Sequence, residues 1–293
     1  MTFTINSGEA FGVVRTLGGE LISYKRDGIE YVWQGNPEHW NGQAPVLFPV
    51  CCAPKDGKMA HFGVEYPMPK HGIARKREFE PVFVSREKVI LEQRETEETL
   101  TMFPFCYSLK LAHEITAEGF STTYTVKNLD KNPMTFCIGG HPGFNCPLTP
   151  DDGGFEDYSL YFENAKGCTV SLTKDGYMNK ELPKLDMLGD TNELPLVYSD
   201  YDNDAMIVEN LPVKRLKLLS RKSGCGFEFR FDGFDALGLW TPIKKHSPFI
   251  CLEPWNGLPA DVDETTDAKS KKYSITLDPD KEYSVGYSIR VIR

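Results

Sequence analysis

The stretch that decides the fold reads Thr135-Phe136-Cys137-Ile138-Gly139-Gly140-His141-Pro142-Gly143-Phe144-Asn145. An apolar run rich in strand-forming residues reaches two glycines and stops at His141. The Pro142 ring disfavours the α region for the residue before it, so we expect the imidazole at the end of a strand. Glycines lack the Cβ that would crowd a ligand or a second strand. A histidine that only filled a core would not need them, and we interpret His141 as functional.

Two other stretches resemble the first. One is Phe249-Ile250-Cys251-Leu252-Glu253-Pro254-Trp255, in which an apolar run ends at Glu253 before a proline. The other is Met68-Pro69-Lys70-His71-Gly72-Ile73-Ala74-Arg75, with His71 between Pro and Gly. The apolar neighbours of Glu253 predict a partly buried carboxylate. Such a group is expected either to pair with another polar group or to have a functional role. We therefore expect two histidines and one carboxylate where strands end.

The rest of the chain contains short alternating runs separated by turn signals, without amphipathic helices. Strands are predicted at residues 11–24, 29–33, 79–85, 88–95, 105–115, 120–126, 205–209, 216–220, 226–231, 236–241, 273–277 and 283–292, and residues 174–204 are expected to be mostly irregular. Asp27-Gly28 predicts a first hairpin, and Asp278-Pro279-Asp280 a last one. The pattern predicts an all-β protein with an antiparallel meander in a sandwich or a barrel. Because no linker divides the chain, we expect one domain over residues 1–293.

Composition excludes several classes of function. A net charge of −9 and a pI near 5.3 would repel phosphate backbones, so nucleic acid is not an expected partner. No apolar run approaches the ~18–20 residues that span a bilayer, and the start of the sequence lacks a signal peptide. We expect a soluble cytoplasmic protein with no membrane partner and with its eight cysteines reduced. Cys137, His141 and Cys146 could be three metal ligands, but there is no paired CxxC and we predict no metal site.

The other candidate residues leave alternatives open. His71 and Arg75 lie four residues apart, and binding of a ligand is as consistent with this spacing as a structural role. The remaining histidines lack a special context and are interpreted as structural; they are His39, His61, His113 and His246. The tryptophans at 33, 40, 240 and 255 are expected mainly in the core.

Taken together, three segments resemble the aldose 1-epimerase (mutarotase) family. They are His71-Gly-Ile-Ala-Arg75, Gly139-Gly-His141-Pro-Gly-Phe144 and Cys251-Leu-Glu253-Pro-Trp255, in this order. The similarity is greatest to the LacX-type branch, which also resembles the chain at Trp33-Gln-Gly and Ala44-Pro-Val-Leu-Phe-Pro49. It covers nearly the whole chain and implies a galactose mutarotase-like supersandwich. It also implies interconversion of the α and β anomers of a sugar without a cofactor or metal.

The resemblance also implies roles for individual residues. His141 would be the general acid and Glu253 the general base, with His71 and Arg75 binding sugar hydroxyls. The family's substrate-binding aspartate would be Asp204, or Asp202 close to it. Either Trp255 or Trp40 could stack on a sugar face. Lys70 beside Arg75 would suit a phosphorylated sugar, which we rank second to a free aldose.

The chemistry fits these residue types without the family. Opening a pyranose removes a proton from the anomeric hydroxyl and gives one to the ring oxygen. A carboxylate with an ordinary pKa of ~4.3, raised by burial, can do the first, and an imidazole near ~6.5 the second. Because both target atoms are bonded to one carbon, Glu253 and His141 must lie within ~8 Å of each other in one pocket.

Two rival functions follow from the same residues. A glycoside hydrolase would normally need two carboxylates, and only Glu253 has a suitable context. A catalytically idle sugar-binding protein on the same scaffold would use His141 and Glu253 to bind hydroxyls. The sequence leaves the sugar and the oligomeric state open.

Overall fold

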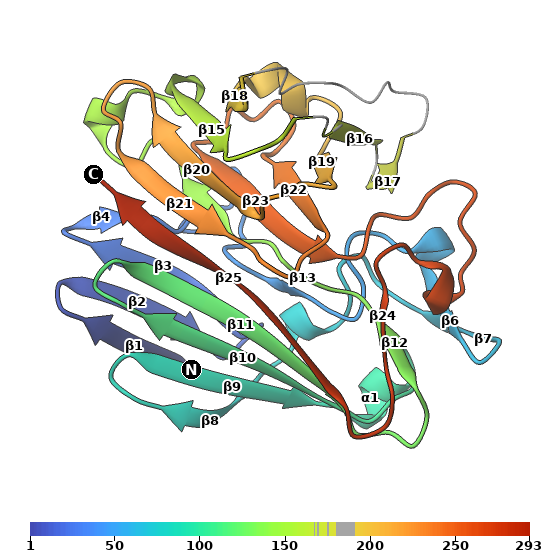
Figure 1. Ribbon diagram of the computed structural model, residues 1–293. Helices are drawn as coiled ribbons and strands as arrows, with labels where there is room; N and C mark the ends of the chain where they lie inside the picture. Colours follow the sequence, from blue (N-terminus) through green and yellow to red (C-terminus); the bar gives the residue numbers. More distant parts are fainter. Residues whose placement is uncertain (167, 169, 175, 180–190) are drawn as a thin grey trace.

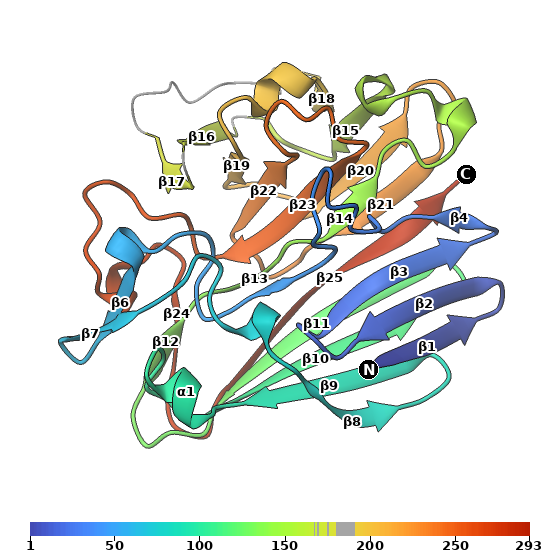
Figure 2. The ribbon, with the colours of Figure 1, turned by 180° about the vertical axis from the view of Figure 1, so that it is seen from behind.

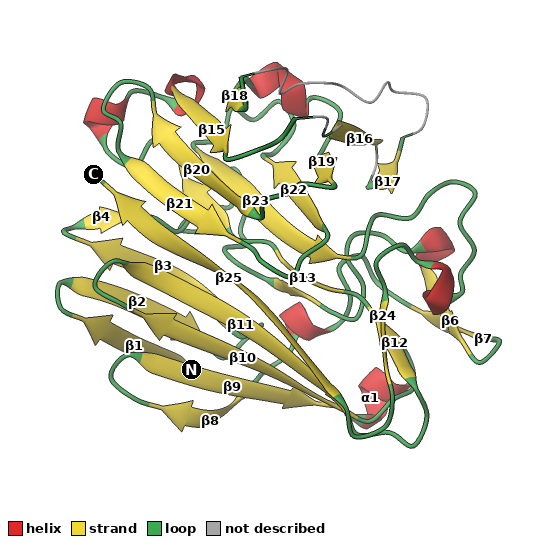
Figure 3. Ribbon diagram, in the orientation of Figure 1, coloured by secondary structure: helices red, strands yellow, loops and turns green. Residues whose placement is uncertain are grey.

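The computed structural model describes residues 1–293 except 167, 169, 175 and 180–190. The described strands pair antiparallel and form a large β-sandwich (Figure 1). Coloured by secondary structure, the chain consists of strands and loops with a few short helical turns (Figure 3). The predicted all-β class and antiparallel sandwich are confirmed. Part of the segment expected to be irregular, at 175 and 180–190, lies outside the described residues.

The larger sheet has nine strands among the described residues. Their order is β18 (Glu193–Pro195), β15 (Tyr158–Phe162), β20 (Arg215–Ser220), β21 (Gly226–Arg230), β25 (Glu282–Ile292), β11 (Gly119–Asn128), β10 (Tyr107–Ile115), β9 (Lys88–Arg94) and β8 (Glu80–Val84). Strands β8 to β11 are neighbours in sequence order, as expected for the predicted meander. The alternation of apolar and polar residues in this region therefore located the strands correctly.

A second sheet carries the candidate site. Within the described residues it has the order β17 (Tyr177–Met178), β16 (Val170–Lys174), β19 (Met206–Glu209), β22 (Ala236–Trp240), β23 (Phe249–Asn256), β13 (Ile138–Gly140) and β5 (Val46–Leu47), with β14 (Gly143–Asn145) also paired to β23. Strand β23 is buried along its whole length. It is therefore the central strand, paired with β22 on one side and with β13 and β14 on the other.

Smaller elements complete the fold. A four-stranded sheet next to β9 and β10 comprises β1 (Thr2–Ser7), β2 (Ala10–Arg15), β3 (Glu20–Arg26) and β4 (Ile29–Glu30). Two pairs are β6 (Lys58–His61) with β7 (Val64–Pro67), and β12 (Met134–Phe136) with β24 (Ile275–Leu277). The helical turns are α1 (Glu97–Leu100) and 3₁₀ segments at Lys55–Gly57, Ala74–Lys76, Pro150–Asp152, Phe155–Asp157, Tyr198–Tyr201 and Ala268–Ser270. No helix in the described part of the chain is long and apolar enough to cross a membrane.

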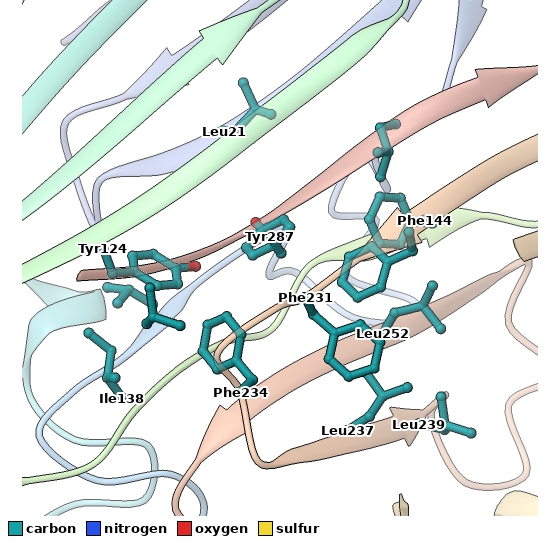
Figure 4. Close-up of a cluster of buried hydrophobic side chains, with 14 of the residues drawn as sticks. Leu21, Tyr124, Ile138, Phe144, Phe231, Phe234, Leu237, Leu239, Leu252 and Tyr287 are labelled. Carbon is teal, nitrogen blue, oxygen red and sulfur yellow. The ribbon is translucent and has the colours of Figure 1, made fainter. Parts of the chain in front are cut away.

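The hydrophobic core fills the space between the two large sheets. Figure 4 shows Tyr124 of β11 and Tyr287 of β25 on one side, with Leu252 of β23 and Leu239 of β22 across from them. All four side chains are buried and belong to one continuous cluster. The core therefore fixes β22 and β23 against the nine-stranded sheet, so the outer face of these strands has a rigid support.

Three expectations about the strands were wrong. The run 11–24 is two strands, β2 and β3, because the chain turns at Gly18-Gly19, where both glycines have positive φ. The predicted last hairpin does not form, since β24 pairs with β12 whereas β25 pairs with β11 and β21. The third concerns Glu253, which lies inside β23 and not at its end. The first hairpin turn at Asp27-Gly28 is confirmed, between β3 and a short β4.

His113 gives the fold a pH dependence that can be tested. The ring is buried, Nε2 lies 2.8 Å from the Gly19 carbonyl oxygen, and Nδ1 lies 3.0 Å from Thr122 Oγ1. Burial lowers the pKa of His113 to about 4. In the unfolded chain a histidine binds its proton below about 6.5, so between about pH 6.5 and 4 the unfolded state binds more protons than the folded state.

Stability is therefore expected to fall as the pH is lowered through that window, with a contribution from His113 of up to about 3 kcal/mol. Urea unfolding of the wild type and of His113→Gln at several pH values would measure it. The variant should lose less stability between about pH 6.5 and 4 than the wild type. Equal losses in the two proteins would show that His113 does not contribute.

Candidate active site

A cavity of about 260 Å³ lies against the second sheet. Figure 2 shows the elements around it from behind, with β13, β23 and β22 adjacent and β19 and β16 beyond them. The cavity is lined by Trp40, Cys52, Lys70, His71, Arg75, His141, Thr173, Gly176, Asp204, Ala205, Trp240, Glu253, Trp255 and Pro259. All seven residues predicted for the site are in this list. Segments more than 200 residues apart in the sequence thus contribute to one cavity.

His141 and Glu253 form a close pair in this cavity. His141 Nε2 lies 3.2 Å from Glu253 Oε2, well within the ~8 Å limit that the chemistry sets. The contact does not have the geometry of a hydrogen bond, and Glu253 Oε2 and His141 Nδ1 have no hydrogen-bond partner among the described residues. Both side chains are almost completely buried. Each of these two groups therefore keeps one polar atom without a hydrogen bond from the described residues.

The strand pattern explains why these two residues meet. Strand β13 ends at Gly140 and β14 begins at Gly143, and both pair with β23. The His141-Pro142 break between them lies opposite Glu253 on the uninterrupted β23. Because the His141 amide donates to the Pro45 carbonyl oxygen at 3.0 Å, the break is held in place from its other side. The prediction that His141 follows a strand is confirmed.

The flanking glycines serve the packing of the strands. A Cβ on Gly139 would lie 2.6 Å from Trp255 Cδ1, and one on Gly140 would lie 2.7 Å from the Tyr124 hydroxyl oxygen. Of the two uses predicted for these glycines, room for a ligand and room for a second strand, the contacts support the second. The glycines let β13 lie close to β23 and to the opposite sheet, and so position the histidine that follows.

Burial controls the protonation of the pair. It lowers the pKa of His141 to about 3, and positive charge on Arg75 and Lys70 acts in the same direction. Burial also raises the pKa of Glu253 well above its usual range, an effect that Lys70 opposes and Asp204 reinforces. Both shifts therefore favour the uncharged form of each group.

Trp40 covers one face of His141. The two rings are stacked with their centroids 4.9 Å apart. The loop that carries Trp40 is held by its ends, because the Trp33 amide donates to the Gly143 carbonyl oxygen and the Gly143 amide donates to the Gln43 carbonyl oxygen. The Trp33 indole N–H also donates to the Trp40 carbonyl oxygen at 2.8 Å. The imidazole plane of His141 is consequently fixed by an aromatic neighbour.

His71 is held by the backbone of Cys52. Its amide donates to the Cys52 carbonyl oxygen at 2.8 Å, and its Nδ1 accepts from the Cys52 amide at 3.1 Å. Nδ1 therefore carries no proton, which leaves Nε2–H as a donor for a ligand. Burial, and then the nearby His141, lower the pKa of His71 well below its usual value. The next residue must be glycine, since Gly72 has φ +75° and a Cβ there would lie 2.1 Å from the Phe48 carbonyl oxygen.

Arg75 and Lys70 supply positive charge at the cavity. Arg75 donates from Nη2 to the Lys70 carbonyl oxygen at 3.3 Å, and its buried Nε has no hydrogen-bond partner in the described part of the chain. Neither side chain forms an ion pair with a carboxylate of the described residues. A structural ion pair, one of the two expectations for Arg75, is thus not seen among these residues. Within the described part of the chain, both cations are thus left without a carboxylate partner.

Asp204 is the aspartate that lines the cavity, and Asp202 does not line it. Asp204 Oδ1 accepts a hydrogen bond from the Trp240 indole N–H at 2.9 Å, and its backbone has φ +98°. Such a conformation is strained for a residue with a side chain. The indole of Trp240, which also packs edge-to-face against His141, orients a strained carboxylate next to the pair.

The structure also places the residues for which sequence reasoning was weakest. Trp255 is 1% exposed, with its ring against Gly139 and Gly238, so no open face is available for stacking on a sugar, whereas Trp40 is only partly buried. Cys52 and Trp240 were not predicted to support the site. Cys52 acts through its backbone, which no side-chain pattern reveals, and the contact of Trp240 with Asp204 spans 36 residues.

The positions of the other histidines and of the metal-ligand candidates can also be compared with the expectations. Among the described residues, none of the four histidines interpreted as structural lines the cavity. His141 does belong to a group of donors close enough to hold a metal ion, but its companions are Cys251 and Glu253, and not Cys137 and Cys146. Among the described residues, the set considered from the sequence does not form such a group.

Comparisons with known proteins agree with this geometry. The family model described as aldose 1-epimerase matches residues 1–290. The plasmid form of protein LacX from Lactococcus lactis is 35% identical over 286 residues, which are 90% of this chain and 95% of LacX. A galactose mutarotase-like protein from Lactobacillus casei superposes with a TM-score of 0.92 at 30% identity over 100% of both chains. A galactose mutarotase-related enzyme from Lactobacillus acidophilus gives a TM-score of 0.92 at 27% identity, covering 100% of this chain and 98% of the other. The chain belongs to the aldose 1-epimerase family.

Proposed function

We propose that the protein is an aldose 1-epimerase that interconverts the α and β anomers of a free aldose by general acid–base catalysis. The observation that carries the proposal is the contact between His141 and Glu253, 3.2 Å apart and buried in a cavity of about 260 Å³. A base and an acid at this separation can reach the anomeric hydroxyl and the ring oxygen of one pyranose together. No second carboxylate is needed, in contrast to glycoside hydrolysis.

The reaction requires two coupled proton transfers. Glu253 takes the proton of the anomeric hydroxyl while His141 protonates the ring oxygen, and the bond between C1 and that oxygen breaks to give the open-chain aldehyde. After rotation about C1–C2 the ring closes on the other face and the two protons return. The starting form needs ionised Glu253 and protonated His141. The uncharged pair and this form contain the same number of protons, so conversion of one into the other needs no uptake from solvent.

The other residues of the cavity would bind the sugar. His71 offers Nε2–H to a hydroxyl oxygen, and Arg75, which lines the cavity, offers its guanidinium group. Asp204 accepts from the Trp240 indole through Oδ1 and lines the cavity, where its carboxylate would accept from a hydroxyl. These donors and acceptors surround the pair on several sides, so the sugar would be oriented before its ring opens.

A phosphorylated aldose is the second candidate substrate. It is favoured by Lys70 and Arg75, two cations at the cavity without carboxylate partners among the described residues. Proton NMR of freshly dissolved single anomers, over a panel of free aldoses and aldose phosphates, tests both candidates. Acceleration with a free aldose supports the first, and acceleration confined to phosphates supports the second. Measurable binding without acceleration of any sugar would show a catalytically idle binding protein.

Substitution of the two residues assigned to binding gives a further test. Arg75→Met and His71→Asn are expected to raise the Michaelis constant by roughly 10–100-fold, the usual cost of a lost hydrogen bond to a charged or buried group. Arg75→Met is the cleaner variant, because the side chain of His71 also binds the Cys52 backbone. Initial rates at several sugar concentrations would measure the effect, with circular dichroism as the check on folding. An unchanged Michaelis constant with a lowered melting temperature would assign both residues a structural role.

A further inference from the structure

Cys251 lies beside the proposed catalytic pair and has no part in the reaction. Residues two apart on a strand point to the same face, so β23 presents Cys251 and Glu253 side by side. His141 reaches the same point from the break between β13 and β14. The thiol sulfur, an imidazole nitrogen and a carboxylate oxygen lie within 4.8 Å of one another, and all three residues are buried.

The atoms of this cluster are also unsatisfied. Glu253 Oε2 and His141 Nδ1 have no hydrogen-bond partner among the described residues, although buried polar atoms are nearly always paired. No Cys251 thiol hydrogen bond is found there either, and Cys251 packs with Trp33 and Phe249. The Glu253 oxygen and the Cys251 sulfur lie beside the imidazole of His141 and have no protein partner among these residues, so a ligand that accepts lone pairs from both would satisfy them.

The donor set selects the kind of ligand. One sulfur, one nitrogen and one oxygen donor suit Zn²⁺ or Co²⁺, whereas Mg²⁺ and Ca²⁺ prefer oxygen donors alone. In a tetrahedral zinc site with bonds of about 2.0–2.3 Å, neighbouring ligand atoms are about 3.3–3.7 Å apart. The 3.2 Å between His141 Nε2 and Glu253 Oε2 is close to that range, and the Cys251 sulfur lies within 4.8 Å of its two partners.

We propose that His141, Cys251 and Glu253 form a site for Zn²⁺, which binds there as a reversible inhibitor. Binding releases the thiol proton of Cys251 and the proton shared by the other two groups, because metal ligands bind in their deprotonated forms. A bound ion would occupy the lone pairs that the proton transfers need. The inhibition rests on the proposed function, whereas the metal binding does not.

Metal binding is tested with Co²⁺ as the probe, since a cobalt–thiolate bond gives a charge-transfer band in the near ultraviolet. The wild type should show the band, and Zn²⁺ should displace the cobalt and remove it. Cys251→Ala and Cys251→Ser should lack the band, with affinity for Zn²⁺ reduced by at least about 100-fold. Cys146→Ala, which removes another buried thiol outside the donor cluster, should keep it. A band absent from the wild type, or still present in both Cys251 variants, would overturn the site.

Inhibition is tested on the same proteins. Zn²⁺ should slow anomer interconversion by the wild type, a chelator should restore the rate, and Cys251→Ser should keep its basal rate while resisting at least about 100-fold more Zn²⁺. Cobalt bound through Cys251 without any effect of Zn²⁺ on an active enzyme would overturn the inhibitory role. If the protein proves inactive with every sugar, the cobalt band still decides whether the metal site exists, so the two proposals fail separately.

Discussion

Replacing Glu253 with glutamine is expected to lower the rate of anomer interconversion by roughly 10²–10⁴-fold. Glutamine has nearly the same shape but cannot take the proton of the anomeric hydroxyl. His141→Asn should lower the rate by a similar factor, because the ring oxygen then leaves without a proton donor. Steady-state rates of mutarotation of the best substrate, with circular dichroism to confirm folding, would provide the measurement.

The double variant shows whether the two residues act in one shared step or independently. Both protons move in the same step, so once one partner is lost the other has little left to contribute. The rate of Glu253→Gln/His141→Asn should therefore lie close to that of either single variant. A loss equal to the product of the two single losses would mean that the residues act independently, contrary to a shared step across their 3.2 Å contact.

A methyl group at position 140 is expected to destabilise the protein by about 1–3 kcal/mol. In Gly140→Ala the new Cβ would lie 2.7 Å from the Tyr124 hydroxyl oxygen and 2.9 Å from Tyr287 Cε1, in the core between the two large sheets. The tyrosine rings are buried and cannot move away without disturbing their neighbours. The strain is applied one residue before His141, so the rate should fall as well.

The midpoint of urea unfolding would measure the loss of stability in Gly140→Ala. Gly154→Ala is the matched control, because that glycine has negative φ, lies on the surface and would meet its nearest atom only at 4.0 Å. Equal midpoints for the two variants would show that the close approach of β13 to the opposite sheet does not limit packing.

Local patterns in the sequence located those parts of the fold that depend on local interactions. Alternating residues predicted the meander from β8 to β11, whose neighbours in space are neighbours in sequence. The Gly-Gly-His-Pro-Gly segment likewise predicted the strand end at His141, because a proline restricts the residue directly before it.

Predictions from the sequence failed where pairing between distant segments of the chain determines the structure. Strand β23 continues through Glu253, since β22 pairs with it along that stretch, and the proline that suggested a strand end is accommodated. The expected last hairpin is absent because β24 finds its partner in β12, more than 130 residues away. The support of His71 by the Cys52 backbone, and of Asp204 by Trp240, likewise depends on contacts that no local pattern encodes.

Exchange NMR of an aldose at anomeric equilibrium in D₂O tests the central claim most directly, because it follows ring opening without net reaction. The account predicts that the protein accelerates exchange between the α and β anomeric protons, that Glu253→Gln removes most of this acceleration, and that no deuterium enters at C1 or C2. Two results would contradict acid–base ring opening by His141 and Glu253. One is that the wild type leaves the exchange rate of every aldose and aldose phosphate unchanged. The other is that acceleration is accompanied by incorporation of deuterium at carbon.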